Sequence, residues 1–311
     1  KKKYDDVTVI MSPSFGLEYF EQQHLNDNLF PLSGFSNKKT INCNENGYYS
    51  IFQSDRFGFN NPDTEWDSDD IEFLLVGDSF TIGSCVNRPH DIGSKLRQLS
   101  NKNVLNLGYV ANGPLFQYAT LREYLDKKVK NIIWLYYEND IFNLDRDLKS
   151  KILLKYLKDK NFSQNLKFKQ GKIDNALTKF LVKVEDLEAK KQLIDKEEKN
   201  SLIYKIEKFI TLKNVRELFL DKYFIKQNIQ KKIRPEFEQI LSKSKKLSDE
   251  NDSDFYFVFL PSYERYAYGY DKDQVLYDQI KIIVNKLNIK FIDIHKEFLD
   301  NKKNQMEYFP F

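Results

Sequence analysis

The stretch Ile71-Glu72-Phe73-Leu74-Leu75-Val76-Gly77-Asp78-Ser79-Phe80-Thr81 decides the fold of this chain. A short, mostly apolar run ends in a glycine turn, and a serine hydroxyl follows directly. Open α/β sheets bind their ligands at the carboxyl ends of their strands, which is where this pattern predicts Ser79. The backbone N–H groups of a helix start can also stabilise a developing negative charge. We therefore treat Ser79 as a candidate nucleophile.

Strand and helix patterns alternate on the carboxyl-terminal side of this stretch. We predict further strands at 104–108, 131–137, 255–260 and 290–294, and helices at 90–100, from Gly113-Pro114 onward, at 236–247 and at 271–287. The run at 131–137 is apolar on both faces, which is typical of a parallel strand covered by helices. The pattern predicts an α/β fold, a three-layer α/β/α sandwich with a five-stranded parallel flavodoxin-like sheet.

Two segments interrupt or precede the alternation. Residues 1–70 are expected to form an irregular amino-terminal extension with short strands at 7–11 and 48–52. Residues 143–233 are expected to be a helical insertion into an α/β domain made of 71–142 and 234–311. Apolar stripes at Leu177–Leu187 and at Leu202–Ile210 favour an insertion that covers its own core, with a lid or a dimer surface as the alternative.

Composition narrows the class of function. The hydrophobic share of 41% in 311 residues is enough for a sizeable core. Lys+Arg 49 against Asp+Glu 46 gives a mixed surface, which argues against nucleic acid as a partner. No GxGxxG, Walker, HExxH or GxSxG pattern occurs, so we expect no cofactor. The acidic stretch from Asp63 to Asp70 lacks the glycine turn of a calcium loop, so we expect a solvated loop and no metal.

The two cysteines, Cys43 and Cys85, allow two interpretations. No CxxC pair is present, which argues against a zinc site or a thioredoxin-like redox motif. A Cys43–Cys85 disulfide is one interpretation, and a pair of free buried thiols is the one that the sequence favours.

Polar groups follow three of the predicted strands, at the same edge of the sheet. They are Asp78-Ser79, Asn106-Leu107-Gly108 and Glu138-Asn139-Asp140. A serine nucleophile needs a base for its proton and donors for the oxyanion of its tetrahedral intermediate. The backbone N–H groups of Ser79 and Gly108, together with the Asn139 amide, can supply three such donors.

These pieces resemble the first three sequence blocks of the SGNH (GDSL-type) hydrolase superfamily, in order and in spacing. The stretch Ser54-Asp55-Arg56-Phe57-Gly58-Phe59-Asn60-Asn61 resembles the lead-in of bacterial envelope-associated members. The resemblance implies Ser79 as nucleophile and Ser79, Gly108 and Asn139 as oxyanion donors. It implies an esterase, often one that acts on O-acetylated sugars, while some relatives are O-acyltransferases. It also implies an extracytoplasmic or membrane-anchored protein, of which this chain is a piece truncated at both ends and without the anchor.

The chain departs from the family pattern in two places. Tyr137 stands where the third block has glycine, and the Asp-x-x-His that supplies the base is missing. The histidines are His24, His90 and His295, and Asp293-Ile294-His295 has a different spacing. Three interpretations stay open: the base lies beyond Phe311, His295 acts as base beside Asp293, or the module is catalytically inert.

The sequence thus predicts a serine esterase that hydrolyses a carboxylic ester, such as an O-acetyl glycan, through an acyl-enzyme. The alternatives are an O-acyltransferase on a polysaccharide and an inert glycan-binding module, and the expected partner is an acylated small molecule or glycan. Each residue also has a purely structural interpretation: Ser79 and Asp140 can cap helices, and Asn139 can be a turn residue. Glu138 and Asp140 also suggest a carboxylate pair. The oligomeric state is left open.

Overall fold

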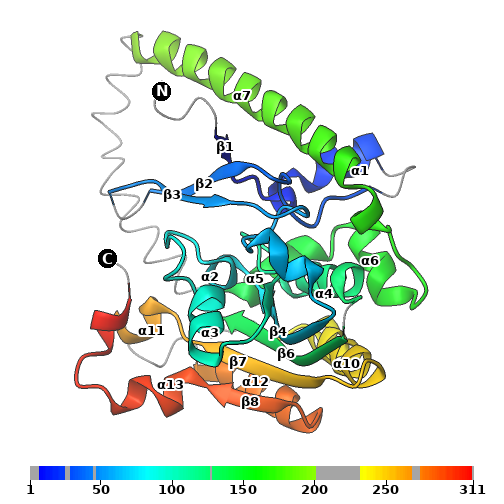
Figure 1. Ribbon diagram of the computed structural model, residues 1–311. Helices are drawn as coiled ribbons and strands as arrows, with labels where there is room; N and C mark the ends of the chain where they lie inside the picture. Colours follow the sequence, from blue (N-terminus) through cyan, green and yellow to red (C-terminus); the bar gives the residue numbers. More distant parts are fainter. Residues whose placement is uncertain are drawn as a thin grey trace.

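The computed structural model describes residues 7–24, 29–44, 47–126, 128–200, 232–267 and 274–309. Its centre is a parallel sheet, with all neighbouring strands running in the same direction. The strands in chain order are β4 (Asp70–Gly77), β5 (Val104–Asn106), β6 (Lys128–Tyr137), β7 (Asp254–Leu260) and β8 (Lys290–Asp293). In space their order is β5-β4-β6-β7-β8 (Figure 1), which is the flavodoxin-like order. The predicted five-stranded sheet is confirmed.

Helices cover both faces of this sheet and complete three layers. Alternate residues of a strand point to opposite faces, and Leu75, Leu135 and Val258 form one cluster with Leu96 of a helix. The other face carries the larger core, in which Tyr136 lies 5.7 Å from the Phe237 ring. The helices that follow the strands are α3 (Ile92–Ser100), α4 (Pro114–Tyr124), α10 (Pro235–Glu250) and α12 (Gln274–Lys286). The predicted sandwich is therefore confirmed.

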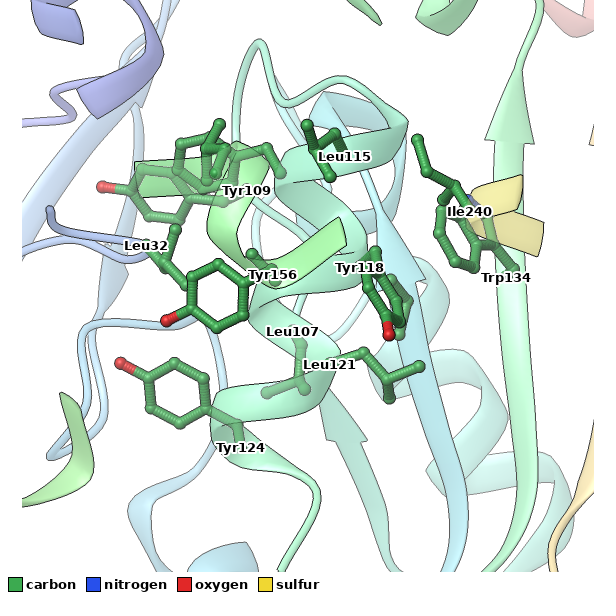
Figure 2. Packing of buried hydrophobic residues seen from close by; sticks show 14 of the residues in the cluster. Leu32, Leu107, Tyr109, Leu115, Tyr118, Leu121, Tyr124, Trp134, Tyr156 and Ile240 are labelled. Carbon is green, nitrogen blue, oxygen red and sulfur yellow. The ribbon is translucent and has the colours of Figure 1, made fainter. Parts of the chain in front are cut away.

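Helix α4 is the most deeply buried helix-forming segment of the core. Gly113 precedes it and Pro114 is its first residue, a start that the sequence predicts. All of its residues except Arg122 are buried. Figure 2 shows why: Trp134 and Ile240 lie on one side of α4, and Leu32 and Tyr156 lie on the other. The sheet and the amino-terminal segment therefore enclose α4 between them.

The connection between β6 and β7 is mostly helical where the structure describes it. Its described elements are α5 (Asp140–Asp147), α6 (Lys151–Lys158), a 3-10 turn (Leu166–Phe168) and the long α7 (Gln170–Asn200). Leu177 and Phe180 of α7 are buried, and the Phe180 ring lies 4.9 Å from Phe20 of α1 (Leu17–His24). These side chains belong to the same cluster as the sheet core. The predicted stripe at Leu202–Ile210 lies outside the described residues.

The amino-terminal segment is more regular than the sequence predicts. Its strands β1 (Thr8–Val9), β2 (Lys39–Cys43) and β3 (Ser50–Gln53) form a separate sheet, which lies beneath α7 in Figure 1. The strands expected at 7–11 and 48–52 correspond to β1 and β3. Strand β2 was not predicted, because Lys39-Thr40-Ile41-Asn42-Cys43 is short and largely polar.

A disulfide joins this small sheet to the core. Cys43, at the end of β2, bonds Cys85 in the loop after α2 (Ser79–Ile82), with their Cα atoms 5.0 Å apart. The interpretation as two free thiols is therefore wrong. The same loop is held by Asn42, whose Nδ2 donates to the Gly83 carbonyl at 3.3 Å. Bridge and hydrogen bond together tie the segment after Ser79 to β2.

The acidic stretch is structured. Asp63–Asp67 forms a 3-10 helix, and Arg56 pairs with both Asp63 and Asp67 at 2.7 and 2.8 Å. Glu65 accepts from the Val104 backbone N–H at 2.9 Å, so this stretch contacts the edge strand β5. The expectation of a solvated loop is therefore wrong. Among the described residues, no group of His, Cys, Asp or Glu side chains has the arrangement of a metal site. None of the described helices has the length and apolar character needed to cross a membrane.

Candidate active site

Ser79 lies where the sequence predicts it, directly after β4 and at the start of α2. Gly77 permits the turn, because a Cβ atom there would lie 2.1 Å from Thr81 Oγ1. The cap of α2 is Asp78, whose Oδ1 accepts a 2.9 Å hydrogen bond from the Phe80 N–H. The structural interpretation of Ser79 as the cap is therefore wrong. Ser79 itself is half-buried.

Gly108 packs directly against the helix that carries Ser79. A Cβ atom at Gly108 would lie 2.5 Å from Thr81 Cβ and 2.6 Å from the Ile82 nitrogen, so glycine is required for this close approach. The Gly108 N–H donates to Asn106 Oδ1 at 2.8 Å. Two of the predicted pieces are thus brought together. The predicted oxyanion donor thus makes an internal hydrogen bond.

Asn106 connects three segments around Ser79, a role that sequence reasoning missed. Its Nδ2 donates to the Thr81 carbonyl at 2.5 Å, so the side chain holds α2 as well as Gly108. Its backbone N–H donates to Asn61 Oδ1 at 2.8 Å, and Asn61 Nδ2 donates to the Asn106 carbonyl at 3.0 Å. The Asn-x-Gly spacing was the available signal, although it pointed only to Gly108.

The lead-in stretch Ser54–Asn61 packs against α2 and hydrogen-bonds to it. Asn60 Nδ2 donates to the Ile82 carbonyl at 2.8 Å. Asp55 accepts from the Phe59 N–H at 2.9 Å and from Trp66 Nε1 at 2.8 Å. Burial raises the pKa of Asp55 to about 6, although these donors favour its ionised form. The stretch that resembles the envelope-associated family members thus fixes the position of the Ser79 helix.

Asn139 follows β6, the strand next to β4. Its side chain is exposed and makes no capping hydrogen bond to α5, although Asn139 occupies the cap position. Asp140 lies inside the helix, so it is not the cap either. The end of β6 contacts α2 through Tyr137, whose ring stacks on Phe80 at 3.8 Å. The amide of Asn139 is therefore presented to solvent at the strand end beside the one that carries Ser79.

Tyr137 occupies the position where the family pattern has glycine. Its ring packs on Phe80, the residue after the candidate nucleophile, and burial raises the pKa of its hydroxyl. Phe80, which directly follows Ser79 in the chain, is partly exposed, and the Tyr137 ring stacks on it.

Two buried carboxyl groups lie behind Ser79. Asp78 Oδ2 accepts from Ser79 Oγ at 3.3 Å, and the Asp140 carboxyl contacts that of Asp78. Asp140 Oδ2 also accepts from Gln117 Nε2 at 3.0 Å. Burial raises the pKa of both carboxyl groups, and their mutual repulsion raises that of Asp140 further. Sequence reasoning named Asp78 and Asp140 but did not predict their contact.

Glu138 and Asp140 do not form the carboxylate pair that their spacing suggests. Glu138 makes a buried ion pair with Arg265 of α11 (Tyr263–Ala267) and accepts from the Ser262 N–H at 2.9 Å. Asp140 instead faces Asp78. The two side chains therefore bind different partners, and Glu138 ties the end of β6 to the segment after β7.

His295 lies in α13 (Ile294–Glu297), directly after β8. Its Nδ1 is 2.8 Å from the Tyr266 hydroxyl and 3.5 Å from Asp300 Oδ1. The residue is 2% exposed, and burial lowers its pKa, which favours the neutral imidazole. Asp293 does not orient this ring: its carboxylate accepts from the Tyr277 hydroxyl and, at 3.1 Å, from the Lys296 N–H.

Three strand spacings separate Ser79 from His295. Gly77 pairs with Leu135, Leu135 with Val258, and Val258 with Ile292. At about 4.8 Å per spacing, the ends of β4 and β8 lie about 14 Å apart. A general base needs hydrogen-bond reach of the proton it removes. This separation of the strand ends does not favour His295 as the base, which stays a prediction. His90 is exposed, as its loop position predicts, and the side chain of His24 is outside the described residues.

Comparisons with known proteins find similarity only among solved structures. No family model matches the chain. No curated protein matches it either. Among solved structures, a putative lipolytic protein of the G-D-S-L family from Desulfitobacterium hafniense DCB-2 matches at 11% identity and a TM-score of 0.37, over 73% of this chain and 78% of that one.

A second solved structure is AlinE4, an SGNH-hydrolase family esterase. It matches at 10% identity and a TM-score of 0.35, over 76% of this chain and 85% of its own. Both neighbours are described as SGNH-hydrolase or G-D-S-L family proteins. Similarity this distant assigns no activity to the chain.

Proposed function

We propose that this protein is a serine esterase of SGNH type, which hydrolyses a carboxylic ester through an acyl-enzyme on Ser79. The observation that carries the proposal is the position of Ser79, half-buried at the start of α2 and at the carboxyl edge of a parallel sheet. Gly108 packs on the same helix, and Asn139 presents its amide at the neighbouring strand end. An O-acetyl glycan is the proposed substrate, in line with the family resemblance.

In the proposed reaction, Ser79 Oγ bonds to the acyl carbon and its proton passes to a histidine. The carbonyl electron pair moves to oxygen, where the Asn139 amide and the N–H groups of Ser79 and Gly108 stabilise the charge. The intermediate then expels the alcohol, which takes the proton from the histidine, and water releases the acid by the same steps in reverse. The Gly108 N–H has to turn from Asn106 Oδ1 towards the oxyanion during this step.

The proposed base is a histidine from residues that follow Phe311. The separation of about 14 Å between the ends of β4 and β8 argues against His295 in this role. Phe309 lies 5.4 Å from the Tyr266 ring and 6.0 Å from the Tyr263 ring, both in α11. Helix α11 follows β7, which is one strand closer to Ser79 than β8.

The decisive experiment measures acylation of the serine directly. We expect a fluorophosphonate probe to label Ser79 in the natural full-length protein, and Ser79→Ala to lower ester hydrolysis at least roughly a thousandfold. Ser84→Ala is the matched control, because Ser84 lies in the loop after α2 and donates to Asn42 Oδ1 at 3.3 Å. Full hydrolytic activity in a folded Ser79→Ala variant would refute the proposal.

An inert glycan-binding module is the second candidate. The engagement of His295 with Tyr266 and of the Gly108 N–H with Asn106 favours it, because neither group is then in a catalytic contact. Binding of acetylated glycan without any labelling of Ser79 would support this candidate. An O-acyltransferase would label like the esterase, but it would transfer the acyl group to a sugar acceptor added to the reaction.

We also propose an extracytoplasmic location. The Cys43–Cys85 disulfide supports it, because disulfides persist in oxidising compartments and are rare in the cytosol. Mass spectrometry of protein isolated with a thiol-alkylating reagent should find the two cysteines in one linked peptide. Alkylation of both thiols in protein from its natural source would contradict this location.

A further inference from the structure

The loop that follows the Ser79 helix folds back onto that helix. Helix α2 is only four residues long, and residues 83–86 continue from its end. The Ser84 N–H donates to the Ser79 carbonyl at 2.9 Å, and the Gly83 N–H donates to the Phe80 carbonyl at 3.2 Å. Both donors are backbone groups, so a side-chain change such as Ser84→Ala keeps them. The loop 83–86 therefore completes the short helix on which Ser79 lies.

The conformation of the loop 83–86 needs support from outside the loop. Cys85 has a φ of 63°, in the left-handed region that residues with a Cβ atom rarely adopt, and surrounding contacts have to hold such a residue in place. Cys43, at the end of β2, forms the disulfide with Cys85, and Asn42 Nδ2 donates to the Gly83 carbonyl at 3.3 Å. Because this hydrogen bond is long, the covalent bridge is the stronger of these two ties between β2 and the loop.

Other contacts hold the segments on either side of the loop without the bridge. Asn60 Nδ2 donates to the Ile82 carbonyl at 2.8 Å, which supports α2 from the lead-in stretch. Beyond the loop, Asn87 Oδ1 accepts from the Ile51 N–H of β3 at 3.0 Å. Opening of the bridge therefore releases the loop 83–86 while both of its ends keep a contact, so the two cysteines stay near enough to bond again.

We propose that the Cys43–Cys85 disulfide is a redox switch that controls the reactivity of Ser79. A dithiol that reduces the bridge releases the loop 83–86, and Ser79 then reacts more slowly, because its helix loses the two hydrogen bonds from the loop. Reoxidation restores the bridge and the rate. Cys43 and Cys85 are positioning residues, since they act through the loop and not on the substrate. This inference rests on the proposed function, because it concerns the nucleophile of that reaction.

The switching step is a thiol–disulfide exchange. A thiolate of the dithiol attacks one sulfur of the bridge, which breaks the bond between Cys43 and Cys85, forms a mixed disulfide and releases one cysteine thiolate. The second thiol of the dithiol then displaces the other cysteine. The bridge takes up two electrons and two protons, and the dithiol is oxidised to its own disulfide. Both cysteines are half-buried, and neither belongs to a core cluster.

The experiment measures fluorophosphonate labelling of Ser79 in the natural full-length protein before and after treatment with dithiothreitol. We expect dithiothreitol to reduce the bridge in the folded protein and the labelling rate to fall roughly tenfold, because a small displacement of a nucleophile is costly. Removal of dithiothreitol and addition of oxidised glutathione should restore the rate. Cys43→Ala/Cys85→Ala is the matched control, which should label at the rate of the reduced wild type with or without dithiothreitol.

Hydrogen exchange gives a second readout that does not depend on reactivity. Reduction should speed the exchange of the Gly83 and Ser84 amides, which donate to carbonyls of α2. The Leu107 amide, which donates to the Leu75 carbonyl of the central sheet at 2.8 Å, should keep its exchange rate. Release of the loop is thereby distinguished from a general loss of stability.

Three results would overturn the inference and leave the proposed function in place. They are a bridge that dithiothreitol opens only when the protein unfolds, reduced wild type that labels at the rate of the oxidised protein, and exchange that speeds equally at Leu107 and Ser84. No labelling of either the oxidised or the reduced protein would overturn the proposed function and, with it, the switch.

Discussion

The nucleophile half of the carboxyl edge of the sheet and its junction with the histidine half hold buried acids in different ways. The nucleophile half comprises the ends of β4, β5 and β6 with α2, α4 and α5, and its acids Asp78, Asp140 and Asp147 meet neutral donors or each other. The histidine half comprises the ends of β7 and β8 with α11 and α13. Where it joins β6, Glu138 meets a guanidinium, that of Arg265. The difference teaches that acids buried at one sheet edge are accommodated either by a counter-charge or by neutral hydrogen-bond donors.

The ion pair at the junction of the two halves should have the largest effect on stability. Arg265→Met leaves Glu138 buried without its counter-charge, so we expect the free energy of unfolding to fall by about 3–5 kcal/mol at neutral pH. Urea denaturation measures this loss. The double variant Arg265→Met/Glu138→Leu should recover much of it, and a double variant as unstable as the single one would contradict this explanation.

Two buried acids, Asp147 of α5 and Asp55 in the stretch before β4, should make stability depend on pH. Burial raises the pKa of Asp147 to about 7 and that of Asp55 to about 6. Because both folded-state values lie above those of the unfolded chain, their stabilising contribution is complete below about pH 4 and is lost as the pH rises through 6 to 7. Asp147→Asn should therefore be roughly 2–4 kcal/mol more stable than wild type at about pH 8, and close to it at about pH 4.

Chemical denaturation at several pH values measures this difference. The control is Asp249→Asn, which removes an exposed acid paired with Lys245 and should leave the pH dependence as it is. A pH profile of Asp147→Asn parallel to that of the wild type would show that Asp147 does not titrate as proposed.

Asn106, which hydrogen-bonds to Thr81 and Gly108 in the nucleophile half, should affect both the stability of the protein and the reactivity of Ser79. Asn106→Ala leaves the Thr81 carbonyl and the Gly108 N–H without their partner, which costs about 2–3 kcal/mol. Since both groups belong to the site, labelling of Ser79 should also slow by roughly tenfold or more, a loss of about 1.4 kcal/mol in the barrier. Ser244→Ala, which removes a buried hydroxyl on α10, should lower stability without slowing the probe.

The smallest effect is expected in the histidine half. Tyr266→Phe removes the hydroxyl that lies 2.8 Å from His295 Nδ1, so the free energy of unfolding should fall by about 1 kcal/mol. Labelling of Ser79 should stay at the wild-type rate, because His295 is not its proposed base. Labelling that changes severalfold in Tyr266→Phe and also in His295→Ala would show that His295 takes part in the reaction of Ser79.

The sequence predicted what depends on local pattern. The apolar runs at 71–76 and 131–137 and the Gly113-Pro114 helix start suffice to place β4, β6 and α4, because strand and helix periodicity and caps are short-range features. They also place Ser79, Gly108 and Asn139 at one sheet edge.

The contacts that complete the site could not be predicted in this way. Asn61 and Asn106 bond across 45 residues, and Glu138 and Arg265 across 127, so no local spacing signals either contact. The disulfide and the small sheet containing β2 depend on the same kind of long-range approach. The contact of Asp78 with Asp140 required knowing that β4 and β6 are neighbours and that both side chains turn inward.

The long connection between β6 and β7 also has a consequence for how the chain folds. Strands β4, β5 and β6 pair within residues 70–137, whereas β7 joins them only after the chain returns at Asp254. Closing a long loop delays the contacts that depend on it. During synthesis the nucleophile half can therefore assemble while β7 and β8 are still on the ribosome, and until they arrive β6 exposes an open edge that can pair with other chains.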